Sequence, residues 1–165
     1  MGIACQSQAA SLLAFRVTCT TLTYVGARVD VTSEAVAMNL LRLRNAAGLS
    51  LRTLSAELAD RGVTITAQSL SAVELGKTAV TVDLLTALAV VLGVSPATLL
   101  MPYTEDGFVP TMRLTGTDAT YPISLYEWLI GVAPLGLPIA TSEIDPRTIE
   151  AFRNRAQPRW LREED

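Results

Sequence analysis

Between positions 34 and 102, apolar residues recur every three or four positions, the spacing that places them on one face of an α-helix. Glycines that can close a helix interrupt this pattern, and Ser or Thr residues that can cap the next helix follow them. Five helices are therefore expected, over about 33–47, 51–62, 67–75, 82–92 and 96–101. In the first helix, the residues expected to face the core are Val36, Leu40, Leu43 and Ala47.

The segment before this domain is patterned less clearly. Residues 1–33 contain a stretch rich in β-branched residues at 17–25, which is compatible with a strand. We expect an N-terminal extension that is either extended or disordered. Translation that starts at Met38, or further downstream, is an open alternative that would make this extension incidental.

The segment after the domain, residues 103–165, predicts a small α-rich appendage. One short helix is expected in the run "SLYEWLIG", capped by Ser124, and a second is expected after Asp145, where proline follows at the first helical position. Trp160 near the end of the chain is expected to pack back on the body. The segment is expected either to support self-association or to cover the core of the preceding domain.

Charge is distributed unevenly along a chain of 165 residues with a formal net charge of −3. Residues 35–102 carry five basic and four acidic side chains, whereas residues 103–165 carry six basic and ten acidic ones. The acidic excess therefore lies outside the five-helix domain. This leaves the domain open to a polyanionic partner such as nucleic acid.

Composition argues against several functional classes. The chain has no histidine, which removes the commonest general base, and its two cysteines, Cys5 and Cys19, match no zinc spacing. No apolar run reaches membrane-spanning length, and no positive charge precedes the run "SLLAF" as it would in a signal peptide. We expect a cytoplasmic protein that is not an enzyme and holds no cofactor or metal.

An ordered series of residues in the first three helices carries a family resemblance. The series consists of Arg44, Gly48, Leu49 and Ser50, then Leu54 and Ser55, then Leu70, Ser71, Val73, Glu74, Gly76 and Lys77. It resembles the Cro/C1-type (XRE family) helix-turn-helix regulators, and the run "LLTALAVVLGVSPATLL" is similar to that family's closing pair of helices. The resemblance covers about residues 34–102 and implies a mostly α-helical, five-helix DNA-binding domain.

Two departures from the family pattern affect the expected site. Leu51 occupies the position where the family often has Gln, and the link between the second and third helices, "ADRGVTIT", is longer than usual. We interpret this link as one more turn of the second helix, closed at Gly62, followed by a short extended connector. The third helix is therefore expected to dock on DNA at an angle different from the family norm.

The resemblance implies roles for particular side chains. The residues expected to read bases at the start of the third helix are Ala67, Gln68 and Ser69, followed by Ser71 and Ala72. The residues expected to contact phosphates are Ser50, Arg52 and Lys77. Arg44 is expected to pair with Glu74 in a structural role, whereas Arg42 is interpreted either as a solvated charge or as a phosphate contact.

These inferences lead to two functional hypotheses. The first is a sequence-specific transcriptional regulator, a repressor that binds a double-stranded DNA operator as a homodimer. The second is a helix-turn-helix-derived protein-interaction module, an antitoxin-like or adaptor subunit that no longer reads DNA; the missing Gln and the net acidity keep it open. Salt-dependent binding of a defined operator would favour the first. The operator and any effector are not readable from the sequence.

Overall fold

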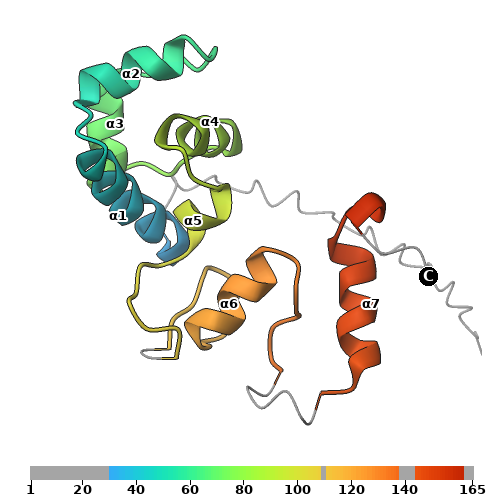
Figure 1. Ribbon diagram of the computed structural model, residues 1–165. Helices are drawn as coiled ribbons and strands as arrows, with labels where there is room; N and C mark the ends of the chain where they lie inside the picture. The colour runs from blue at the N-terminus through green and yellow to red at the C-terminus, as the bar shows by residue number, and fades with distance from the viewer. Residues whose placement is uncertain (1–29, 109–110, 138–143, 162–165) are drawn as a thin grey trace, which may run out of the picture.

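Seven α-helices follow one another along the part of the chain that the structure describes, residues 30–108, 111–137 and 144–161 (Figure 1). In this computed structural model the helices are α1 (Val31–Ala46), α2 (Leu51–Ala59), α3 (Ala67–Glu74), α4 (Val82–Leu92), α5 (Pro96–Leu100), α6 (Pro122–Leu129) and α7 (Pro146–Ala156). One turn of 3₁₀-helix, Arg159–Leu161, follows α7. Regular β pairing within these ranges is limited to one antiparallel bridge between Met112 and Thr120. The expectation of a mostly α-helical fold is confirmed.

The helices of the five-helix domain begin where their capping residues are placed in the sequence. Each cap accepts a hydrogen bond from the backbone N–H three residues further on, which satisfies a donor that the helix itself leaves free. The four side chains that do so are Ser50, Thr66, Thr81 and Ser95. At the other end of α1, Gly48 has a φ of 67°, the left-handed conformation that was expected to close this helix.

The core of the five-helix domain lies between α1, α2, α3, α4 and α5. Its buried residues are mostly leucines: Leu40, Leu54, Leu58, Leu70, Val73, Leu84, Leu88, Ala89 and Leu99. Val36 is buried as well, and Leu43 packs against the cluster from its edge. Apolar residues at i, i+3 and i+4 therefore build one continuous core, as the periodicity predicts.

Four expectations about individual residues are wrong. α1 begins at Val31, about two residues earlier than predicted, and Ala47 is the exposed C-cap of α1 rather than a core residue. Ser124 lies inside α6, because Pro122 already occupies the first helical position. Trp160 does not pack back on the body, since 82% of its surface is exposed. Residues 1–29, and with them both cysteines, lie outside the described part of the chain.

The C-terminal segment, residues 103–161, is hydrogen-bonded to the first turn of α1. The side chain of Asp30, the N-cap of α1, makes no capping hydrogen bond. Instead, the N–H of Thr32 donates to Thr115 Oγ1 (3.3 Å), and the N–H of Thr115 donates to Thr32 Oγ1 (2.8 Å). A residue 83 positions away thus satisfies a helix-terminal donor that local sequence leaves unpaired.

Helix α7 is held by the turn that follows α6. Arg153 Nε donates to the carbonyl of Val132 (3.0 Å), and Gln157 Nε2 donates to the carbonyl of Gly131 (3.0 Å). Asp145 caps this helix as expected, since its carboxylate accepts the N–H of Arg147. No helix in the described ranges combines the length and the apolar character needed to cross a membrane.

A buried amide on α1 completes the C-terminal end of α5. Asn39 is 1% exposed, and its Nδ2 lies 3.2, 3.0 and 2.7 Å from the carbonyl oxygens of Thr98, Leu99 and Met101, to which it donates. These carbonyls have no partner within the helix because α5 is only five residues long. The sequence does not reveal this role of Asn39, since a polar side chain within an apolar stretch looks the same with or without a distant partner.

Replacing Asn39 with Ala should lower the free energy of unfolding by about 1–3 kcal/mol, because it leaves buried carbonyls without a donor. Urea unfolding followed by circular dichroism measures the change. The matched control is Asn45→Ala on the same helix, where the side chain is exposed; a change of about 0.5 kcal/mol or less is expected. Equal unfolding midpoints for the two variants would contradict the role assigned to Asn39.

Candidate nucleic-acid interface

Helix α3 presents one apolar and one polar face. Leu70 and Val73 are buried against the core, and α3 packs against both α1 and α2. The first turn of α3 projects away from this contact, and Gln68 and Ser69 are exposed there. A short helix packed on a second helix, with its first turn accessible, is the geometry in which a helix-turn-helix enters the major groove.

The residues expected to read bases differ in how free their side chains are. Gln68 is exposed and its amide has no hydrogen-bond partner within the described ranges. The hydroxyl of Ser69 is 2.9 Å from Thr66 Oγ1, so it belongs to the capping arrangement of α3. Ala67, Ser71 and Ala72 are half-buried. Of the five, Gln68 is therefore best placed to make a two-point contact with adenine.

The two basic residues expected to contact phosphates are both exposed. Arg52 lies in the first turn of α2, and Lys77 follows the end of α3; neither forms an ion pair or a side-chain hydrogen bond with the described residues. The third expected phosphate contact, Ser50, uses its hydroxyl to accept the N–H of Thr53 at 3.0 Å. Exposed, unpaired cations in the first turn of α2 and after the end of α3 suit phosphate binding, which positions a protein on DNA.

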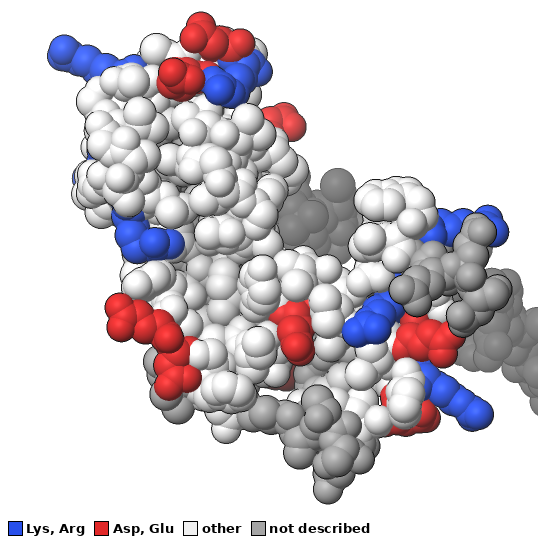
Figure 2. All heavy atoms as spheres, viewed as in Figure 1, with Lys and Arg blue, Asp and Glu red and all other residues white. Residues whose placement is uncertain are grey.

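The end of α2 has a different electrostatic character from its beginning. Arg61 and Glu57 form an exposed ion pair at 2.9 Å, and Asp60 lies next to them in the sequence. Figure 2 shows acidic and basic side chains intermingled over α2 at the top of the view, above a largely uncharged face. Because two carboxylates accompany one cation there, this end of α2 does not belong to the phosphate-binding surface.

An ion pair positions α3 against α1. Arg44 Nε is 2.5 Å from Glu74 Oε1, Arg44 Nη2 is 3.0 Å from Glu74 Oε2, and the two side chains are only 12% and 7% exposed. The guanidinium also donates from Nη1 to the carbonyl of Leu49 at 2.8 Å. The structure thus contains the bidentate pair that the sequence predicts, and the hydrogen bond to Glu74 raises the pKa of Arg44 above its ordinary value.

The longer link between α2 and α3 has its own anchor. Ser55 stands where the family has Ala, and its hydroxyl donates to the carbonyl of Ile65 in this link. Val63 and Ile65 pack against the core from the edge, and Gly62 closes α2 with a φ of 82°. The longer connector, one of the two departures from the family pattern, is therefore held to α2 by a hydrogen bond.

Arg42 contacts the C-terminal segment. Its guanidinium carbon is 4.3 Å from the centroid of the Tyr103 ring, and Nη2 donates to Asn39 Oδ1 at 3.3 Å. The side chain of Arg42 is exposed, as expected of a solvated charge, and the alternative of a phosphate contact stays a prediction; the cation–π contact adds to the first interpretation. The sequence gives no sign of this contact, because Arg42 and Tyr103 are far apart in the chain.

Comparison with known protein families matches residues 40–99 to the family described as helix-turn-helix. This range lies within the expected domain, residues 34–102, and includes α2, α3, α4, the C-terminal part of α1 and most of α5. Residues 40–99 are therefore a helix-turn-helix domain of the Cro/C1 type, and the match supports a DNA-binding helix-turn-helix regulator. Neither the curated proteins nor the solved structures gave a match.

Removing either side of the Arg44–Glu74 pair should cost about 3 kcal/mol of unfolding free energy, because the remaining charge is left poorly solvated without its partner. We expect Arg44→Met and Glu74→Gln to show this loss in urea unfolding. The double variant should lose less than the sum of the two single losses, since it leaves no unpaired charge.

The exposed pair between Glu57 and Arg61 provides the matched control. Breaking it with Glu57→Gln should change the unfolding free energy by no more than about 1 kcal/mol, because water already screens that pair. Strictly additive losses for Arg44 and Glu74 would show that the two side chains stabilise the domain independently.

Proposed function

We propose that the protein is a sequence-specific, DNA-binding transcriptional regulator that reads the major groove with the first turn of α3. The observation that carries this proposal is the free, exposed amide of Gln68 on a capped helix that an ion pair holds at its other end. A rigid helix with a polar first turn can present an amide to a base edge without first being ordered. The family match over residues 40–99 supports the same class.

Base reading and backbone contact are assigned to different residues. The proposed reading surface is Ala67, Gln68, Ser69, Ser71 and Ala72, with Gln68 as its main contact. The proposed phosphate contacts are Ser50, Arg52 and Lys77. Ser50 and Arg52 lie at the start of α2, where free backbone N–H groups also favour a phosphate.

The proposed ligand is a double-stranded DNA operator in the cytoplasm, bound by a homodimer. Twofold operators place two half-sites about one helical turn apart, so two copies of α3 are needed to read one operator. Repression is the simplest outcome, because a protein that occupies its operator excludes other proteins from the same DNA. A reporter gene under the identified operator should therefore become more active when the protein is removed.

Losing the Gln68 amide should weaken binding to the preferred operator by about 1–3 kcal/mol and leave binding to scrambled DNA almost unchanged. Losing the Lys77 charge should weaken both kinds of DNA similarly and lower the slope of log affinity against log salt by about one unit. The operator is first selected by the purified protein from a random double-stranded library. Fluorescence anisotropy at several salt concentrations then compares Gln68→Ala with Lys77→Ala.

The control for the lost charge is Arg155→Ala on α7, which removes an exposed cation far along the chain from the reading helix. It should leave operator affinity and the salt slope unchanged. Unaltered operator preference in Gln68→Ala would place the reading face elsewhere on α3. A purified protein that selects no DNA at all would favour the protein-interaction module instead.

We further propose that the C-terminal segment supports self-association. Trp160 and Leu161 at its end are adjacent large apolar side chains that are 82% and 55% exposed, and contiguous exposed apolar surface marks interaction sites. A contact between two copies would remove this apolar surface from water.

Chains that end at Gln157 and at Pro102 test this assignment by sedimentation equilibrium. We expect both to dissociate at least tenfold more readily than the full chain, because both lack Trp160 and Leu161. The chain ending at Pro102 retains the Asn39–Met101 hydrogen bond, and its thermal melt checks that the five-helix domain remains folded. If both shortened chains dimerise with the same dissociation constant as the full chain, the dimer contact lies in the five-helix domain instead.

A further inference from the structure

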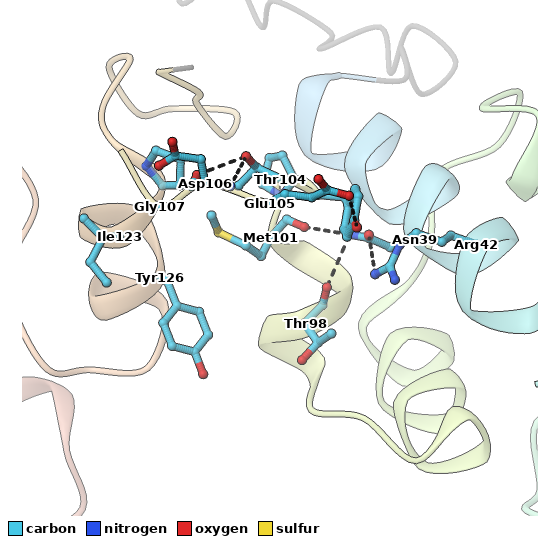
Figure 3. A pocket seen from close by; sticks show the side chains of 13 residues that line it. Asn39, Arg42, Thr98, Met101, Thr104, Glu105, Asp106, Gly107, Ile123 and Tyr126 are labelled. Atoms are coloured by element: carbon cyan, nitrogen blue, oxygen red, sulfur yellow. Dashed lines mark hydrogen bonds between the residues drawn. The ribbon is translucent and has the colours of Figure 1, made fainter. Parts of the chain in front are cut away.

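A pocket of about 310 Å³ lies where α1 and α5 meet the linker 101–107 and the first turns of α6. Figure 3 shows its lining side chains on these segments, with Ile123 and Tyr126 of α6 on one side, Asn39 and Thr98 on the other, and Met101 between them. Its volume is at the lower end of the range for sites that bind small molecules. The helix-turn-helix assignment gives this pocket no role.

The pocket has an apolar lining with aromatic walls. Met101, Pro102, Pro122 and Ile123 supply apolar surface, and two tyrosines, Tyr103 and Tyr126, are 53% and 42% exposed. Large aromatic rings that remain accessible beside apolar groups favour a flat, apolar ligand. The lining thus selects for a ligand that carries a ring.

Three charged side chains in the lining determine which ligand charge the pocket favours. Arg42 is already engaged by the Tyr103 ring and by Asn39, whereas Glu105 and Asp106 add two carboxylates. Glu105 Oε1 accepts from the Tyr103 hydroxyl at 3.4 Å, and Asp106 Oδ1 accepts from the N–H of Phe108 at 2.8 Å. Within the described ranges, Oε2 of Glu105 and Oδ2 of Asp106 are left to accept from a ligand.

From this arrangement we propose that the pocket binds a small organic monocation carrying an aromatic ring, such as an arylalkyl amine. The ring would contact the apolar lining and the tyrosines, and the ammonium group would meet the free carboxylate oxygens of Glu105 and Asp106. An anion is disfavoured because two carboxylates face one cation whose guanidinium already has partners. A ligand here contacts α1 at Asn39 and Arg42, on the helix that also carries Arg44.

Three probes with one ring system and three charges test the proposal. The full-length protein is titrated by calorimetry with 1-naphthylmethylammonium, with neutral 1-naphthylmethanol and with anionic 1-naphthaleneacetate. The cation should bind about three- to tenfold more tightly than the neutral probe, the increment expected from partly exposed ion pairs, and the anion should bind most weakly. Binding is measured on the protein alone, so the result does not depend on whether the protein reads DNA.

The double variant Glu105→Gln/Asp106→Asn removes both charges and keeps an acceptor oxygen for Tyr103 and for Phe108. It should lose the three- to tenfold preference for the cation and retain the affinity for the neutral probe. Glu127→Gln is the matched control, because this α6 carboxylate does not line the pocket; the preference should survive.

A third variant tests whether the ring occupies the proposed place. Ile123→Ala removes apolar lining without touching a charge, so it should weaken the cation and the neutral probe by a similar factor. Thermal melts confirm that each variant is folded. The proposal is overturned if no probe binds at about 5 mM, if the three probes bind equally, or if the double variant keeps the preference for the cation.

Discussion

The Arg44–Glu74 ion pair is the contact on which the placement of α3 depends. Helix α3 is eight residues long, too short to be stable without packing, and two buried side chains, Leu70 and Val73, fix only its inner face. The pair joins the end of α3 to α1, and the same guanidinium holds the carbonyl of Leu49 in the turn before α2. The side chain of Arg44 therefore contacts three segments at once: α1, the turn before α2 and the end of α3.

With its inner face and its end fixed, α3 has little freedom in what it exposes. Burial of Leu70 turns Gln68 outward, since residues two apart on a helix cannot share a face. The longer connector does not loosen this arrangement, because Ser55 holds the carbonyl of Ile65 and the connector's apolar side chains pack on the core. The domain thus accommodates extra residues while keeping a polar first turn exposed on α3.

Helix α1 contacts both α3 and the C-terminal segment. Its first turn is completed by Thr115, its middle carries Asn39 and Arg42, and its last turn carries Arg44. The candidate ligand pocket and the ion pair that positions α3 therefore share one rigid element.

The sequence by itself determined the local structure of this protein. Capping residues such as Ser50 and Thr66, and glycines such as Gly48, act on backbone groups within a few residues, so their effect can be read from spacing alone. The family resemblance added the pair between Arg44 and Glu74, because its ordered motif places these two residues in a known relation.

Only the tertiary structure determined which residues of the C-terminal part of the chain contact α1 and which stay exposed. Asn39 reaches carbonyls about 60 residues away, and Thr32 finds its partner 83 residues away. No local pattern marks such partners, because a polar residue on a helix looks the same whether water or a distant carbonyl satisfies it. The prediction that Trp160 packs back on the body was wrong for the same reason. Its apolar character predicts a tendency to be buried, but only the packed chain determines whether a surface is available to cover it.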